Sequence, residues 1–168
     1  SKRSPYEAGT RTPIMFSWPG KIAPSERPEL CSSIDIVPTI LAAANASGPS
    51  NLPGLDLLPA LQSVKKIRRN TLFGESFAHD IADIHNPETS LLYRWVIEDE
   101  WKLLLSYDGR PGKMKYPPDE TAPILFNLKS DTNERTDLAD SNQRVVKRLA
   151  RKIARWWPVR ERTVKGLD

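Results

Sequence analysis

The chain of 168 residues contains 39% apolar and 27% charged residues, which is typical of a globular protein of one domain, or of one domain plus part of another. No apolar run approaches the roughly 20 residues that a membrane-crossing helix needs, so no transmembrane segment is expected. A single cysteine, Cys31, excludes an intramolecular disulfide, and we expect it to be a small buried residue.

The net charge of +4 is unevenly distributed along the chain. Residues 141–168 contain nine Lys/Arg and two Asp/Glu, a local charge of +7, whereas residues 1–140 contain sixteen and nineteen, a charge of −3. The basic character therefore belongs to the C-terminal segment, and a high isoelectric point alone does not indicate a nucleic-acid partner. We expect none.

The first part of the chain predicts few regular elements. Residues 1–12 are expected to be loop, and Pro13–Trp18 is predicted to be a short strand that ends at a Pro-Gly turn. Apolar residues at helical spacing predict a helix over Asp35–Asn45, with Asp35 as its N-terminal cap. Leu57–Gln62 is predicted to form one helical turn, and the charged run Lys65–Arg69 is the expected boundary between two parts.

The second part predicts a small sheet and one long helix. Thr71–Gly74 and Leu125–Leu128 are predicted strands, and Leu92–Ile97 and Trp101–Tyr107 are predicted to form a hairpin across a tight polar turn. The last helix is expected to begin at a Ser141 cap and to run to about Trp157. Its apolar residues share one face.

Three stretches, taken in order, resemble patterns of the sulfatases in the alkaline-phosphatase-like superfamily. The first is similar to the surroundings of the family's active-site lysine and consists of Lys2, Tyr6-Glu7-Ala8-Gly9, Arg11, Pro13 and Trp18-Pro19-Gly20. The second resembles the next helix and consists of Ser33, Asp35, Pro38-Thr39 and Leu41. The third resembles the far end of these enzymes and consists of Trp101-Lys102-Leu103, Leu125-Phe126-Asn127-Leu128, Asp131, Glu134, Asp137 and Leu138.

One position departs from the family pattern. Ala8 stands where the family usually has glycine, and a turn with positive φ would be strained there. Glu7 and Arg11 are interpreted as structural partners that hold this loop rather than as catalytic groups.

The resemblance implies an α/β fold of the alkaline-phosphatase-like type. Residues 1–68 would be the C-terminal end of a large mixed α/β catalytic domain, and residues 69–168 a small antiparallel sheet packed with a C-terminal helix. It further implies hydrolysis of sulfate esters or N-sulfates of an aryl sulfate or a sulfated carbohydrate. A periplasmic, secreted or lysosomal location also follows from the resemblance alone.

The resemblance also implies a set of active-site groups. Lys2 would contact the sulfate. A formylglycine, made from Cys or Ser in the pattern C/S-x-P/A-x-R, would be the nucleophile, and Ca²⁺ would polarise the site. No such pattern occurs in this chain, because Cys31 fails it and Ser17-Trp18-Pro19-Gly20-Lys21 has lysine where arginine is needed. We therefore expect a further N-terminal catalytic segment to be the chain's partner, and we expect the 168 residues alone to be inactive.

Two other clusters are candidate sites. Both histidines, His79 and His85, lie in a short polar segment whose spacing fits no compact metal site, so contact with substrate or ordinary loop polarity remain the alternatives. Gly74-Glu75-Ser76-Phe77-Ala78 partly resembles the nucleophile elbow of Ser–His–Asp hydrolases, but its last glycine is missing. No metal ligands are assigned in this chain.

A non-enzymatic alternative rests on the last helix. Six basic residues line one side of it: Arg144, Lys147, Arg148, Arg151, Lys152 and Arg155. Such a helix could bind a polyanion or an anionic membrane surface, or it could simply expose a solvated basic face.

Overall fold

The computed structural model describes residues 4–63, 65–78, 83–107 and 122–159. They divide into two compact units. One unit runs from Thr12 to Leu72, and the other combines the described residues up to Arg11 with those from Phe73 onward. Each unit is considered by itself.

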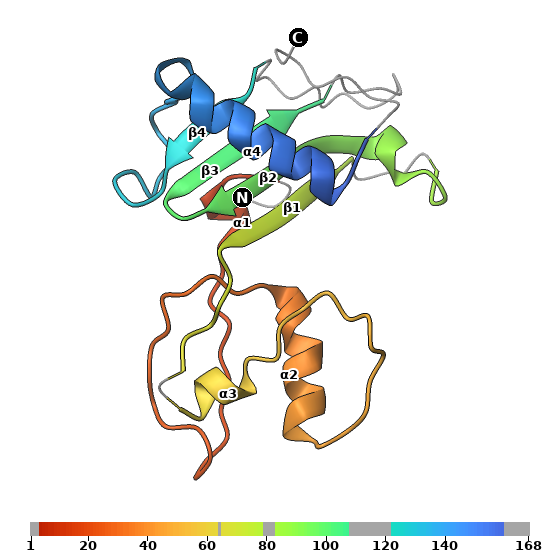
Figure 1. Cartoon of the computed structure of the whole chain (residues 1–168), viewed down its shortest axis with the longest axis vertical. Helices are drawn as coiled ribbons and strands as arrows, with labels where there is room; N and C mark the ends of the chain where they lie inside the picture. The colour runs from red at the N-terminus through yellow and green to blue at the C-terminus, as the bar shows by residue number, and fades with distance from the viewer. Residues whose placement is uncertain (1–3, 64, 79–82, 108–121, 160–168) are drawn as a thin grey trace. The chain divides into compact units, whose positions relative to one another are not determined.

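The second unit is built on a four-stranded sheet in the order β1-β2-β3-β4, as Figure 1 shows. The strands are β1 (Thr71–Phe77), β2 (Leu91–Glu98), β3 (Trp101–Ser106) and β4 (Ile124–Asn127). β2 and β3 form the predicted hairpin, with Glu98 opposite Trp101, and β4 pairs antiparallel with β3. A 3-10 turn over Pro87–Ser90, which was not predicted, precedes β2.

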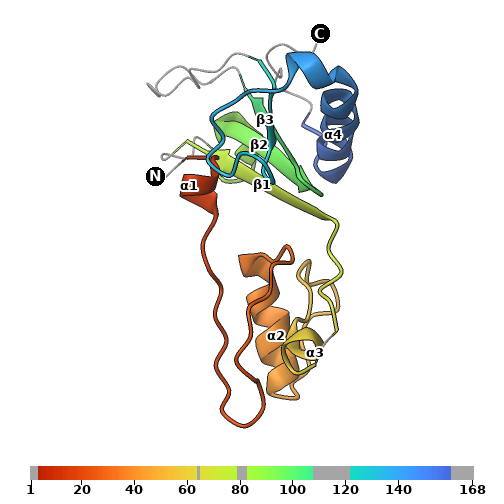
Figure 2. The same cartoon turned by 90° about the vertical axis from the view of Figure 1, so that its left-hand side faces the viewer.

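Helices cover both faces of this sheet. Figure 2 shows α4 (Gln143–Trp156) on one face and the short helix α1 (Glu7–Thr10) on the other. The α4 face contains the larger core, in which Leu103 and Leu105 meet Val146, Leu149 and Ile153. The opposite face carries a smaller cluster of Leu104, Ile124 and Phe126, against which Tyr6 packs. β3 is therefore buried on both sides, which explains its run of leucines.

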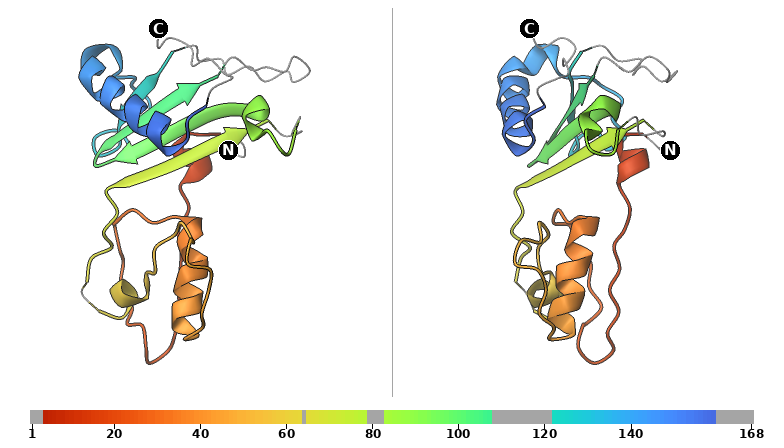
Figure 3. Two further views of the ribbon diagram at one scale, coloured as in Figure 1. Left: turned by 45° about the vertical axis from the view of Figure 1, so that its right-hand side comes forward. Right: turned by 90° about the vertical axis from the view of Figure 1, so that its right-hand side faces the viewer.

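The left view of Figure 3 shows α4 lying across one face of the sheet. Buried Arg94 anchors the C-terminal end of this helix to the sheet. Its guanidinium donates to the carbonyl oxygens of Ile153 and Trp157 and to the Tyr107 hydroxyl. The guanidinium carbon also lies 5.3 Å from the centre of the Tyr107 ring. The exposed carbonyl groups at the last turn of a helix favour a cation. Arg94 therefore stabilises the C-terminal end of α4 and holds the helix against the sheet.

The unit over Thr12–Leu72 contains α2 (Ile36–Ala43) and α3 (Leu58–Leu61). A 3-10 turn over Ser33–Asp35 precedes α2, and Asp35 belongs to a capping box with Ser32 rather than capping the helix alone. Both Arg69 nitrogens donate to the Asp35 carboxylate, at 2.5 and 2.7 Å, and the Leu55 N–H donates at 2.8 Å. Burial by itself raises the pKa of Asp35, but these hydrogen bonds outweigh it and hold the pKa below its ordinary value of 3.8.

Several sequence predictions need correction. Pro13–Trp18 forms no strand, because a strand needs a hydrogen-bonded neighbour and none of the described residues pairs with this segment. Residues 1–12, expected to be loop, contain α1. Ser141 does not cap α4, since its hydroxyl donates to the Leu138 carbonyl inside a preceding 3-10 turn over Asp140–Asn142.

The concern about Ala8 was also misplaced. Ala8 lies inside α1, and it is not among the described residues with positive φ. A helical turn accepts alanine without backbone strain, so the exchange of glycine for alanine is compatible with this local structure.

Candidate functional site

A buried ion-pair cluster brings two of the three sulfatase-like stretches together. The ammonium of Lys102 on β3 lies 2.9 Å from Glu7 Oε1 and 2.8 Å from Glu134 Oε1. The Lys102 side chain is 0% exposed, and those of Glu7 and Glu134 are 12% and 2% exposed. Residues from three distant parts of the sequence thus meet at one point, on the face of the sheet opposite α4.

The sequence positions Lys102 through strand alternation. Successive side chains of β3 point to opposite faces, so Leu103 and Leu105 face α4 while Lys102 and Leu104 face α1. A lysine within an apolar strand was the available signal, but sequence analysis assigned it no role. Its partners lie 95 residues before it and 32 residues after it in the chain, so local patterns could not identify them.

Glu134 reaches the cluster from a strained loop. Its φ is +53°, in the left-handed region that non-glycine residues seldom adopt. Asp131 organises this loop, because its carboxylate accepts the N–H groups of Arg135 and Thr136 at 2.8 and 2.9 Å. The hydrogen bond from the Thr136 N–H is the main cause that holds the pKa of Asp131 below its ordinary value. Asp131 therefore stabilises the loop through its hydrogen bonds, and Glu134 places its carboxylate next to the Lys102 ammonium.

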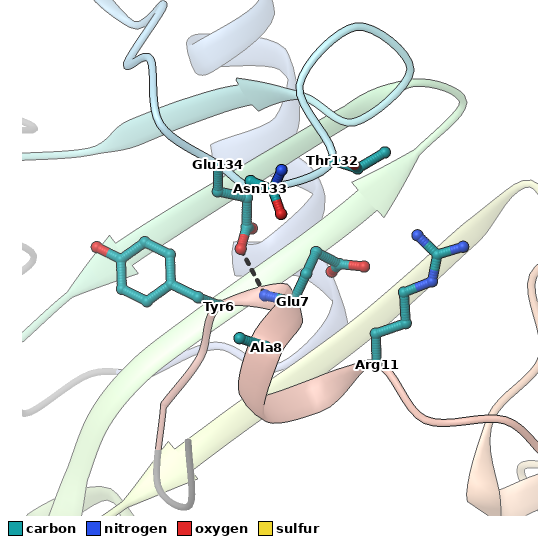
Figure 4. A pocket seen from close by; sticks show the side chains of 7 residues that line it. All are labelled: Tyr6, Glu7, Ala8, Arg11, Thr132, Asn133 and Glu134. Carbon is teal, nitrogen blue, oxygen red and sulfur yellow. Dashed lines mark hydrogen bonds between the residues drawn. The ribbon is translucent and has the colours of Figure 1, made fainter.

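The same carboxylate fixes the start of α1. The backbone N–H of Glu7 donates to Glu134 Oε2 at 2.5 Å, as Figure 4 shows. The first N–H groups of a helix lack partners within the helix, so an acceptor there stabilises its first turn. α1 is only four residues long, and its position depends on this anchor. Glu7 is thus a structural partner, as predicted.

A hollow of about 380 Å³ borders the cluster. Figure 4 shows its lining: Tyr6, Glu7, Ala8, Arg11, Thr132, Asn133 and Glu134. Arg11 stands on its rim and is exposed. Lys2, the predicted sulfate-contacting residue, precedes Tyr6 by four positions and lies outside the described residues.

Of the two predicted histidines, His85 is described, and it does not line this hollow. His85 is exposed, and its backbone N–H donates to Asp83 Oδ1 at 2.8 Å; His79 lies outside the described residues. Cys31 is half-buried rather than buried, and burial is the main cause that raises the pKa of its thiol, which disfavours a nucleophilic thiolate.

The nucleophile-elbow hypothesis is wrong. Gly74 and Ser76 lie within β1, whereas an elbow needs a sharp turn between a strand and a helix. Gly74 has a packing role instead, because a Cβ atom there would lie 2.3 Å from Cζ2 of Trp95.

In the part of the chain that the structure describes, no three His, Cys, Asp or Glu side chains gather as a metal site would require. Nor does this part contain a helix both long and apolar enough to cross a membrane.

Comparison with known proteins places these features in a family. The model of the C-terminal region of N-sulphoglucosamine sulphohydrolase matches residues 1–157. The chain belongs to this sulfatase family. It is 33% identical to bovine arylsulfatase A over 148 residues, covering 86% of this chain and 29% of that protein. It is 28% identical to the N-acetylgalactosamine-6-O-sulfatase of Bacteroides thetaiotaomicron, covering 89% of this chain and 28% of that protein.

The sulfatase fold is also shown by solved structures. A Bacteroides thetaiotaomicron protein, described in work on the metabolism of multiple glycosaminoglycans, matches with a TM-score of 0.69 and 23% identity. The match covers 92% of this chain and 31% of that protein. This confirms the predicted α/β fold of the alkaline-phosphatase-like type. The chain spans less than a third of the length of these relatives. The division at residue 68 into a catalytic-domain end and a C-terminal part stays a prediction.

Proposed function

We propose that this chain is the C-terminal part of a sulfatase that hydrolyses sulfate esters or N-sulfates of a sulfated carbohydrate or an aryl sulfate. The family match over residues 1–157 carries the proposal. Two relatives, named as an arylsulfatase and as a sulfatase of a sulfated sugar, support both substrate classes. The partners are the sulfated substrate and a separate catalytic segment.

Lys2 is the catalytic residue of this chain in the proposal. Hydrolysis places negative charge on the sulfonyl oxygens and on the leaving oxygen, and a compact ammonium with three donors suits such an oxygen. The buried cluster of Glu7, Lys102 and Glu134 supports this role indirectly. It fixes α1, which begins five residues after Lys2 in the sequence.

The nucleophile and the metal come from outside these 168 residues in the proposal. A formylglycine would supply the attacking oxygen and Ca²⁺ would polarise the sulfate in the complete enzyme. The residues of this chain can neither form the formylglycine nor hold the Ca²⁺. The sequence lacks C/S-x-P/A-x-R, and its described residues offer no set of three metal ligands.

Exposed apolar side chains support a packing partner for the unit over Thr12–Leu72. Met15, Val37 and Ile40 are 87%, 52% and 56% exposed, respectively. Val37 and Ile40 are three positions apart on α2, so they share one face of that helix. We assign the catalytic segment as the element that covers this face, because burying it there would remove apolar surface from water. His85 remains a candidate for substrate contact only by resemblance, as does His79.

The proposal is tested by Lys2→Ala in the complete enzyme. Loss of one charge-stabilising contact in a dry site lowers kcat by about 10²–10³. Lys66→Ala is the control, because Lys66 is an exposed lysine to which the proposal assigns no role in catalysis. We expect kcat of the control to match the wild type. A Lys2→Ala enzyme with nearly unchanged kcat would refute the assignment.

A further inference from the structure

The outer side of α4 carries an unusual arrangement of charge. The helix contains six Lys/Arg and no Asp or Glu over Gln143–Trp156. At 100° per residue, its four arginines fall within about 60° of arc, and the two lysines flank them. The buried stripe of Val146, Leu149 and Ile153 lies on the opposite side, against the sheet. The arginine stripe consists of Arg144, Arg148, Arg151 and Arg155, and it is about 16 Å long.

This arrangement works against the stability of the helix. Like charges four residues apart repel one another, and α4 has four such pairs: Arg144 with Arg148, Lys147 with Arg151, Arg148 with Lys152, and Arg151 with Arg155. Arg144 also stands in the first turn, where the helix dipole disfavours a cation and where no acidic residue is present. A helix that only had to be soluble would mix charges of both signs.

Only a small part of this charge is compensated within the described residues. Arg148 and Lys152 both pair with Glu98 of β2, yet their side chains remain 43% and 40% exposed. The Arg151 Nε–H donates to the Lys147 carbonyl oxygen, which neutralises no charge. A hollow of about 220 Å³ lies among Arg148, Arg151, Lys152 and Arg155. Four cationic side chains thus surround a space on the surface that can hold a small anionic group.

We propose that this face of α4 binds a sulfated polysaccharide chain, and so holds a polymeric substrate on the enzyme. The inference rests on the proposed function for the identity of the polymer. A linear stripe of arginines matches a linear polyanion, and guanidinium groups bind the oxygens of such anions in a bidentate manner. A sulfate group on each of several sugars would relieve the repulsion along the helix.

The other anionic partners fit less well. An interfacial helix inserts its apolar face into a membrane, but Val146, Leu149 and Ile153 of α4 are already buried against the sheet. Single-stranded nucleic acids are bound with aromatic side chains for base stacking, and the outward stripe contains none. Trp156 instead stacks on Phe73 with the ring centres 4.9 Å apart.

The test measures binding of the 168-residue chain to heparin in 0.15 M salt. The variant Arg144→Glu/Arg151→Glu/Arg155→Glu leaves the two Glu98 partners in place. We expect its affinity for heparin to fall at least tenfold, with a shallower salt dependence. The matched control Lys65→Glu/Lys66→Glu/Arg68→Glu changes the net charge equally at exposed residues of the other unit, and it should retain most of the affinity. Circular dichroism checks that both variants fold.

Competitor ligands decide the identity of the partner. Desulfated heparin, duplex DNA and phosphatidylserine vesicles should each bind at least tenfold more weakly than heparin. Equal binding of any of these, or equal weakening by both triple variants, would overturn the proposal. Heparin binding by the α4 variants and kcat of Lys2→Ala in the complete enzyme are separate measurements, so a failure here is distinct from a failure of the proposed catalytic role.

Discussion

Lys102 is an ammonium group without access to water, held between two carboxylates. Desolvation of a lysine is costly, and the ion pairs to Glu7 and Glu134 at 2.9 and 2.8 Å offset that cost. Once the cluster exists, removing the one cation leaves two buried carboxylates without a counter-charge. The cluster therefore tolerates the loss of a carboxylate better than the loss of the lysine.

We predict that Lys102→Met destabilises the unit that contains the sheet by about 3–5 kcal/mol. Methionine keeps much of the side-chain volume, so the loss reflects charge rather than a cavity. Urea unfolding followed by tryptophan fluorescence measures it, since Trp95 and Trp101 lie in this sheet. Lys129→Met, at an exposed lysine of the same unit, should change stability by less than about 0.5 kcal/mol. Similar effects of the two substitutions would contradict the energetic role of the cluster.

Strand β1 shows how one glycine decides the packing between neighbouring strands. Gly74 leaves room for the indole ring of Trp95, which packs against Leu104, Ile124 and Phe126. A methyl group at Gly74 would lie 2.3 and 2.4 Å from two atoms of that ring. The ring is held by its neighbours, so it cannot move aside without disturbing the smaller core.

We predict that Gly74→Ala destabilises the sheet by about 1–3 kcal/mol through overpacking. This outweighs the gain of about 0.4–1 kcal/mol that alanine gives by restricting the unfolded chain. Thermal unfolding of the four proteins of a double-mutant cycle with Trp95→Leu measures the coupling. In the Trp95→Leu background the alanine should be neutral or stabilising. If Gly74→Ala costs the same in both backgrounds, the contact with Trp95 is not the cause.

The elements that the sequence predicted well are those specified by local patterns. The β2–β3 hairpin follows from two apolar runs and a tight polar turn, and α4 follows from its single apolar face. The strand expected at Pro13–Trp18 failed because strand formation depends on a partner elsewhere in the chain. The contacts of the candidate site also depend on partners elsewhere in the chain. The motifs identified Glu7, Lys102 and Glu134 as family positions, but their contact is made between distant segments and could not be predicted from any one of them.

The two units differ in how much of their own core they contain. In the unit with the sheet, apolar side chains from every strand from β2 to β4 and from α4 are buried. Among the described residues of the unit over Thr12–Leu72, the buried apolar side chains are those of Leu57 and Ala60, and the buried polar side chains are those of Asp35 and Thr39. Asp35 binds Arg69, and the Thr39 hydroxyl links α2 to the Leu57 N–H at 2.9 Å. A few polar contacts without a larger apolar core give modest stability.

We therefore predict that the isolated 168-residue chain has no sulfatase activity and that its two parts differ in protection. It lacks the formylglycine pattern, and Lys2 alone supplies one charge to a reaction that also needs a nucleophile and an acid for the leaving group.

Hydrogen exchange should be rapid over residues 12–63 and slower over Leu92–Tyr107 and Val145–Trp156, because amide protection follows burial and hydrogen bonding. Mass spectrometry of peptides from the purified chain measures this difference, and hydrolysis of an aryl sulfate in the presence of Ca²⁺ measures activity. Adding the catalytic segment should slow exchange around α2, whose Val37 and Ile40 it would cover. Steady Ca²⁺-dependent turnover by the isolated chain, or equal protection of both parts, would show that these 168 residues need no partner.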